Sequence, residues 1–317
     1  MEIYDTRAEI ASRKNRFLSL VVITLVTFGT LVVLQGVAMA LIPTLFQVSL
    51  EELIALVNGE YDIPNGRMAL LFTQGIGSGL GFWVATWICI RFLEKAELHW
   101  ASQRSRVNLK NLTLVTVITL GGMLFNGLLV YWNSHLILPA SLAELETWMR
   151  EMETQLMELT QYLTDFQSIP ELLTGILVIG VFAGVGEELF FRGLLQPKLQ
   201  GYLRSPHWGI WLTAFIFSAI HVQFFGFLPR LFLGALFGYL YHYTGSLFYP
   251  ILGHILNNAL TVLLVYAANQ GILDLDVQAT DTVSYPGAGI GLLVLILGFL
   301  YFKKVNQTRD EKLDQSI

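Results

Sequence analysis

Residues 184–192 read Gly-Val-Gly-Glu-Glu-Leu-Phe-Phe-Arg, within a run that is predominantly apolar from 169 to 195. A charged side chain at the centre of a membrane helix costs about 2.5–3.5 kcal/mol on insertion scales. The three charges here, Glu187, Glu188 and Arg192, therefore predict a functional site. On a helix Glu188 precedes Arg192 by four residues, an order that favours an ion pair. Glu187 points about 100° away and has no partner in its own segment.

The composition is that of a polytopic membrane protein. Of 317 residues, 54% are hydrophobic and 14% charged, and the mean hydropathy is +0.57. A helix needs about 20 apolar residues to cross a bilayer. Such runs lie near 17–43, 68–93, 111–136, 170–196, 208–226, 228–243, 246–268 and 286–302. We therefore expect an all-α, polytopic integral membrane bundle of about eight transmembrane helices, with an amphipathic extracytoplasmic helix.

The distribution of charge predicts the orientation. Lys and Arg cluster before the first span, between the second and third, after the fourth and at the chain end, whereas the alternate loops hold mainly acids. Cytoplasmic loops carry the excess of Lys and Arg, so both termini are expected in the cytoplasm, and the membrane is expected to be a prokaryotic plasma membrane. The first apolar run exceeds the length of a signal-peptide core and is expected to be retained.

Several patterns predict packing rather than chemistry. The glycines at 75–81 lack the dinucleotide-binding spacing and do not follow a strand. Pairs four residues apart instead predict close helix contacts: Gly75 with Gly79, Gly77 with Gly81, and Gly234 with Gly238. The single cysteine, Cys89, excludes an intrachain disulfide and a thiolate-based metal site.

The loop at 141–166 is predicted to be an amphipathic helix outside the bilayer. Its apolar residues recur at steps of three and four, and Ser141 with Glu144 suggests a capping box. Its acidic face disfavours binding to anionic lipid, so we expect it to lie over the mouth of the bundle or to pair with a partner helix. Residues 49–57 repeat this pattern over a shorter length.

Four further polar residues lie in the later apolar spans: His221, His254, Asn257 and Asn258. A lone His or Asn in a membrane helix is more often an interhelical hydrogen-bonding group than a catalyst. Together with the Glu pair, however, these residues lie on three predicted helices at similar depth. We expect them to share a cavity open to the cytoplasm. Glu, His and amide groups can polarise a water and stabilise an oxyanion, which suits hydrolysis.

These residues form three motifs: Glu187-Glu188-xxx-Arg192, Phe217-xxx-His221 and His254-xxx-Asn258. In this order, on successive spans, they resemble the signature of the CPBP (CAAX protease and bacteriocin-processing) intramembrane proteases of the Rce1-like type. The resemblance covers about residues 170–268. It implies a catalytic core there, with N-terminal helices and the outer helix at 1–169, and a last span and cytoplasmic tail at 269–317.

The resemblance also implies roles for the motif residues. Glu187 is the general base that activates water, and His221 helps to hold that water. His254 and Asn258 stabilise the oxyanion. Glu188 and Arg192 contact the catalytic residues rather than the substrate. Phe217 is expected to pack against His221 and set its rotamer.

Participation of a metal stays open. Glu187, His221 and His254 are a familiar set of zinc ligands, but the chain has no His-Glu-x-x-His helix and no evident fourth ligand. The resemblance favours a glutamate-dependent mechanism without a cofactor, with zinc as the alternative.

The leading hypothesis is an intramembrane endopeptidase acting near the cytoplasmic side, on prenylated CAAX tails or on other membrane proteins and peptides in the lipid bilayer. Nothing in the sequence points to nucleic acid or fixes an oligomeric state. One alternative is a non-catalytic scaffold or bacteriocin-immunity protein that binds a partner. Another is a proton-coupled transporter with Glu and His as relay groups, although no pair of matching broken helices is evident.

Overall fold

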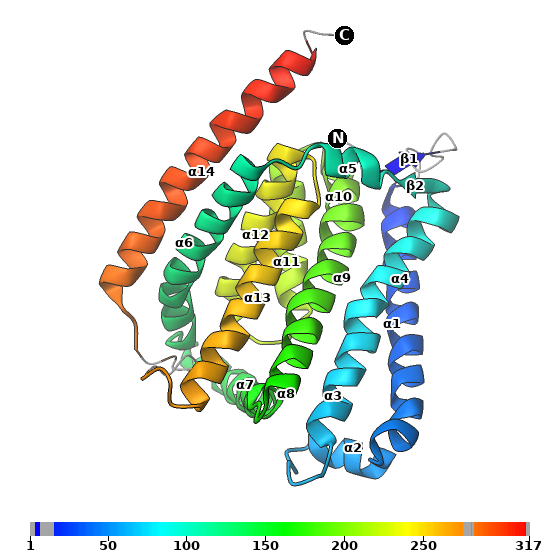
Figure 1. Cartoon of the computed structure of the whole chain (residues 1–317), viewed down its shortest axis with the longest axis vertical. Coiled ribbons are helices and arrows are strands. Elements are labelled where there is room, and N and C mark those ends of the chain that lie inside the picture. The colour runs from blue at the N-terminus through cyan, green and yellow to red at the C-terminus, as the bar shows by residue number, and fades with distance from the viewer. Residues whose placement is uncertain (1–3, 7–15, 275–279, 281, 315–317) are drawn as a thin grey trace.

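The computed structural model describes residues 4–6, 16–274, 280 and 282–314, which form a helical bundle (Figure 1). The helices are α1 (Arg16–Phe46), α2 (Leu50–Val57), α3 (Gly66–Gln74), α4 (Gly81–Ile88), α5 (Trp100–Ser105), α6 (Leu109–Ser134), α7 (Ala143–Thr164), α8 (Ile169–Gly175), α9 (Ala183–Phe190), α10 (Gln196–Leu203), α11 (Pro206–Ala219), α12 (Phe227–Thr244), α13 (Phe248–Asn269) and α14 (Tyr285–Asp314). Two short strands, β1 (Tyr4–Thr6) and β2 (Ala96–Leu98), pair antiparallel. The predicted all-α class is confirmed.

Two of the long helices are continuous but contain π-helical segments. The helix Gly66–Leu93 contains η2 (Gly75–Leu80) and η3 (Cys89–Leu93), and the helix Ile169–Leu203 contains η5 (Ile176–Phe182) and η6 (Phe191–Leu195). A π-helical turn inside an α-helix is rare and is often found at functional sites. Here η5 and η6 flank α9, the helix that carries Glu187 and Glu188.

Six helices in the described residues are long and apolar enough to cross a membrane: Phe17–Phe46, Gly66–Leu93, Leu109–Ser134, Ile169–Leu203, Phe248–Asn269 and Tyr285–Asn306. The apolar runs at 208–226 and 228–243 form α11 and α12, of 14 and 18 residues. At 1.5 Å per residue, α11 is roughly 21 Å long, shorter than the hydrocarbon core. Instead of the expected eight or so spans, the described residues thus contain six such helices, and α11 and α12 form a hairpin of two shorter helices.

Figure 1 shows that α1 begins and α14 ends on the same side of the bundle, whereas α7 lies on the opposite side. This arrangement agrees with the expected even number of crossings.

The glycine pairs make close helix contacts, as predicted. A Cβ added at Gly79 would lie 2.7 Å from Phe182 Cβ, and one at Gly186 would lie 2.2 Å from the Gly79 carbonyl oxygen. On the other face of the helix Gly66–Leu93, a Cβ at Gly81 would lie 2.7 Å from Leu31. Gly79 therefore faces the helix Ile169–Leu203, and Gly81 faces α1.

The predicted amphipathic helix is confirmed as α7, but its predicted capping box is wrong. No side chain caps α7, because a 3-10 turn, η4 (Ala140–Leu142), precedes it. The carboxylate of Glu146 instead accepts a hydrogen bond of 2.8 Å from the Leu138 amide. At the other end, Arg67 Nε of α3 donates to the Tyr162 carbonyl at 2.7 Å, so α7 is bonded to the preceding segment at one end and to α3 at the other.

The shorter predicted helix at 49–57 is α2. Ser49 and Glu52 form a capping box at its N-terminus. These bonds with Ser49 lower the pKa of the exposed Glu52 carboxyl.

Candidate active site

Glu188 lies at the centre of a buried charged cluster. Its Oε1 accepts hydrogen bonds from Arg192 Nη1 at 2.7 Å and from His254 Nδ1 at 2.8 Å. The side chains of Glu188 and Arg192 are both 0% exposed. The ion pair predicted from the spacing is therefore present, and it extends to His254 on α13.

Arg192 also connects two helices. Its Nη2 donates to the Gly234 carbonyl at 2.7 Å, and one turn later Gln196 Nε2 donates to the Gly238 carbonyl at 3.2 Å. A Cβ on Gly234 would lie 3.1 Å from Ala214, and one on Gly238 would lie 2.8 Å from Ile210. The glycine pair of α12 thus packs closely against α11 while its carbonyls bind the helix that carries the Glu pair.

The ring of His254 has a defined orientation. Phe237 stacks on it with a centroid distance of 5.2 Å. Because a carboxylate can only accept hydrogen bonds, the Nδ1 atom bound to Glu188 carries the proton. The Nε2 atom then lies 3.8 Å from Glu187 Oε2.

Glu187 makes no hydrogen bond to another side chain within the described residues, and its side chain is 13% exposed. It lines two cavities together with His221. Glu187, which has no partner in its own helix, thus also has no hydrogen-bonded side-chain partner elsewhere in the described chain.

His221 follows the end of α11. Its Nδ1 donates to the Phe217 carbonyl at 2.7 Å, so in the neutral ring Nε2 carries no hydrogen and can accept one. The Phe217 ring lies 5.1 Å from the His221 ring and 5.9 Å from the His254 ring, measured between centroids. Phe217 therefore contacts both histidines through its ring and holds one of them through its carbonyl.

Asn258 is held between two neighbours. Its Nδ2 donates to the Ile179 carbonyl in η5 at 2.9 Å, and its Oδ1 accepts from Asn257 Nδ2 at 3.1 Å. One hydrogen of the Asn258 amide remains for a ligand.

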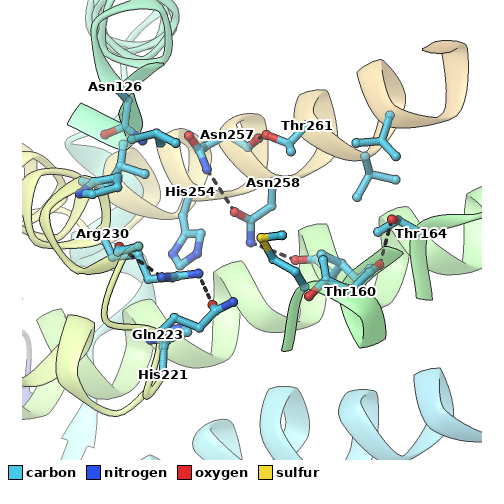
Figure 2. Close-up of a pocket in the computed structure, with 18 of the residues that line it drawn as sticks. Asn126, Thr160, Thr164, His221, Gln223, Arg230, His254, Asn257, Asn258 and Thr261 are labelled. Atoms are coloured by element: carbon cyan, nitrogen blue, oxygen red, sulfur yellow. Dashed lines mark hydrogen bonds between the residues drawn. The ribbon is translucent and has the colours of Figure 1, made fainter. Parts of the chain in front are cut away.

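The four predicted catalytic residues, Glu187, His221, His254 and Asn258, line one cavity of about 460 Å³. Figure 2 shows His254 and Asn258 from α13, and Thr160 and Thr164 from α7, around this space. The lining of this cavity reaches α7, on the side away from the start of α1 and the end of α14, so the expectations of cytoplasmic termini and of a cavity open to the cytoplasm do not hold together. Glu187 lies near the middle of a 35-residue helix, so its depth alone does not tell on which side of the bundle the cavity opens.

A second cavity, of about 300 Å³, meets the first at Glu187 and His221. It is lined by Gln74 and Ser78 of the helix Gly66–Leu93 and by Ile220. The two residues therefore form the boundary between two spaces.

Sequence reasoning missed several polar residues in the lining of the larger cavity, among them Glu153, Gln223 and Arg230. Glu153 of α7 accepts a hydrogen bond of 3.2 Å from the Phe225 amide, and burial raises the pKa of its carboxyl. Arg230 of α12 donates to Gln223 and, at 3.0 Å, to the Gly226 carbonyl. The signal for Arg230 was present in the sequence, since it is a charge inside an apolar run.

The proposed zinc ligands do not form a metal site in this arrangement. In the part of the chain that the structure describes, no three His, Cys, Asp or Glu side chains are grouped so that they could hold a metal. The Nδ1 atom of His254 is already hydrogen-bonded to Glu188, so Nε2 is the only ring nitrogen left to bind a ligand. The residues therefore do not fit a zinc ion as they lie here.

Comparison with known proteins agrees with the motifs. Residues 169–260 match the family model of the type II CAAX prenyl endopeptidase Rce1-like proteins. The uncharacterized protein YpbD of Bacillus subtilis (strain 168) is 33% identical over 97 residues. This match covers 29% of the present chain and 44% of the Bacillus protein, so the chain matches less than half of that relative. No solved structure matches the chain.

The family match coincides with the helices that carry the site, from α8 to the middle of α13. Together with the six apolar helices, it supports an integral membrane protein. Residues 169–260 therefore carry an Rce1-like domain.

Proposed function

We propose that the chain is an intramembrane endopeptidase in which Glu187 activates water to hydrolyse a peptide bond of a membrane-associated protein. One observation carries the proposal. Glu187 lies without a hydrogen-bonded partner in the described chain, at a cavity shared with His221, His254 and Asn258. The family match of this region supports the same reaction.

In the proposed reaction, Glu187 takes a proton from a water that His221 Nε2 helps to hold. The oxygen attacks the scissile carbonyl, the C–N bond of the tetrahedral intermediate breaks, and Glu187 returns the proton to the leaving amine. Both side chains border both cavities, so a water between them has access to a peptide in either space.

His254 and Asn258 are the proposed oxyanion donors. Asn258 has one amide hydrogen beyond the one bound to Ile179. His254 uses its Nδ1 hydrogen on Glu188, so donation from Nε2 requires the doubly protonated ring. In this proposal Glu188 and Arg192 position His254 and do not touch the substrate. No cofactor is required.

The location of the cavity bears on the substrate. We propose a prokaryotic plasma membrane with both termini in the cytoplasm, on the basis of the positive-inside rule. The α7 side, toward which the cavity extends, is then the outer side. This favours peptide segments presented from the outer side over a cytoplasmic prenylated tail.

The test compares peptide termini in membranes of cells that lack the protein, restored with the native chain, Glu187→Gln or Glu51→Gln. Glu51 is an exposed carboxylate of α2, so its substitution is a matched control. Mass spectrometry of released and retained fragments is expected to find new termini with the native chain and with Glu51→Gln, but not with Glu187→Gln.

Identical peptide sets for the native chain and Glu187→Gln, with full rescue of the deletion phenotype by the variant, would exclude the proteolytic mechanism. The scaffold hypothesis predicts this result.

A further inference from the structure

The larger cavity contains a cation that the proposed reaction does not use. Arg230 lines the cavity together with Glu187 and His254. Figure 2 shows its guanidinium beside Gln223, facing the same space as the His254 ring. Among the described lining residues, Arg230 is the only Lys or Arg.

The position of Arg230 is unfavourable unless an anion offsets it. It is the fourth residue of α12, whose N-terminal turn contains no acidic residue. A cation in the first turn lies at the positive end of the helix dipole. In the described part of the chain, no carboxylate oxygen lies within 4.0 Å of the guanidinium. Glu153 and Glu187 act on it only through space.

The guanidinium is held in place but is not saturated. Nη2 donates to Gln223 Oε1 and Nη1 donates to the Gly226 carbonyl at 3.0 Å. Of the five N–H groups of an arginine, these bonds use two, which leaves three. The Arg230 side chain also lies directly over Gly226, where an added Cβ would come within 2.2 Å of Nη1.

Gln223 adds a second donor. Because its Oε1 accepts from Arg230, its amide group still has two hydrogens. Both residues line the cavity. A planar arginine fork beside an amide donor suits a carboxylate better than it suits a neutral peptide group.

We propose that Arg230 and Gln223 bind a carboxylate of the peptide substrate and so fix its direction relative to Glu187. This inference rests on the proposed function and adds a specificity-determining residue to it. The carboxylate is either the C-terminal carboxylate of the chain or an Asp or Glu side chain. The cavity volume of about 460 Å³ lies in the range that buries a small ligand, so a short peptide segment is the appropriate probe.

The test measures binding, so that it does not depend on turnover. Full-length protein in detergent is titrated with three probes: the peptide acetyl-Ala-Leu-Leu-Ala as the free acid, the same peptide as the C-terminal amide, and acetyl-Ala-Leu-Asp-Ala amide. Glu187→Gln serves as the parent, so that the probes are not consumed. Thermal stabilisation and isothermal titration report binding.

We expect the free acid, the Asp-containing amide or both to bind about 10- to 100-fold more tightly than the neutral amide, as for a hydrogen bond to a charged group. The acid and Asp probes separate a chain-end carboxylate from a side-chain carboxylate. Arg230→Gln is expected to remove the preference. Arg230→Lys keeps the charge without the fork and is expected to retain part of it.

Two further variants give an independent disruption of the site and a control. Gly226→Ala displaces the guanidinium without changing any charge and is expected to weaken binding of the preferred acidic probe. Arg204→Gln makes the same substitution at an exposed arginine after α10 and is expected to leave binding unchanged.

Equal affinity for the charged and neutral probes, absence of binding by all three, or an undiminished preference in Arg230→Gln would each overturn the inference. A charged-probe preference in a protein that yields no new peptide termini in cells would instead support the carboxylate site while contradicting the proteolytic function.

Discussion

At the scale of single residues, Glu188 organises the site more than its neighbour does. It binds Arg192 on its own helix and His254 on α13. The first contact follows from the four-residue spacing, whereas the second depends on how the helices pack. Glu188 was expected only to support the residues that contact the substrate, but it is the residue that orients His254.

The Glu188–Arg192 pair predicts a large effect on stability. Arg192→Met leaves the Glu188 carboxylate buried without its cation, and breaking a buried pair costs about 3–5 kcal/mol. The double variant Glu188→Gln and Arg192→Met removes both charges. Because the two residues are in contact, it is expected to lose less than the sum of the two single variants.

Thermal unfolding of the purified protein in detergent measures these differences. Additive losses in the double variant would show that the pair does not act as a unit.

At the scale of elements, the helix Ile169–Leu203 is positioned by close backbone contact. Gly186, adjacent to Glu187, lies against the Gly79 carbonyl of η2. No side chain could stand between the two helices at this point. The placement of Glu187 therefore depends on a residue that carries no chemistry.

Gly186→Ala is expected to destabilise the protein and to displace Glu187, because the added Cβ would lie 2.2 Å from the Gly79 oxygen. Gly29→Ala is the matched control, since a Cβ there meets nothing within 4 Å. We expect a lower melting temperature and reduced production of new peptide termini for Gly186→Ala alone. Equal melting temperatures for the two variants would contradict the close contact.

At the scale of the whole molecule, the bundle has two distinct faces. The chain ends of α1 and α14 lie on one face and α7 on the other (Figure 1). The positive-inside rule predicts that the first face is cytoplasmic. If so, the cavity beneath α7 extends toward the outer face.

Two serine-to-cysteine variants test this orientation. The native Cys89 is buried and 0% exposed, so it is expected to contribute little background. Ser141→Cys, beside α7, is expected to react in intact cells with a maleimide that does not cross membranes. Ser102→Cys, in α5, is expected to react only after the cells are opened. Both serines are exposed. The reverse labelling pattern would invert the topology.

The sequence was sufficient to predict the helical class, the glycine contacts, the amphipathic helix and the buried ion pair. Each depends on spacing along one segment or on the length of an apolar run. The side of the cavity could not be predicted, because it depends on how α7 folds over the bundle. Arg230 was overlooked for a different reason, since it lies in the shortest of the apolar runs, at 228–243.

The boundary formed by Glu187 and His221 has a consequence for product release. With one space of about 460 Å³ on one side and one of about 300 Å³ on the other, a peptide cut at this boundary leaves its two halves in separate compartments. On the proposed function, the two halves then begin their release from different spaces, so a fragment retained on one side does not occupy the space that holds the other.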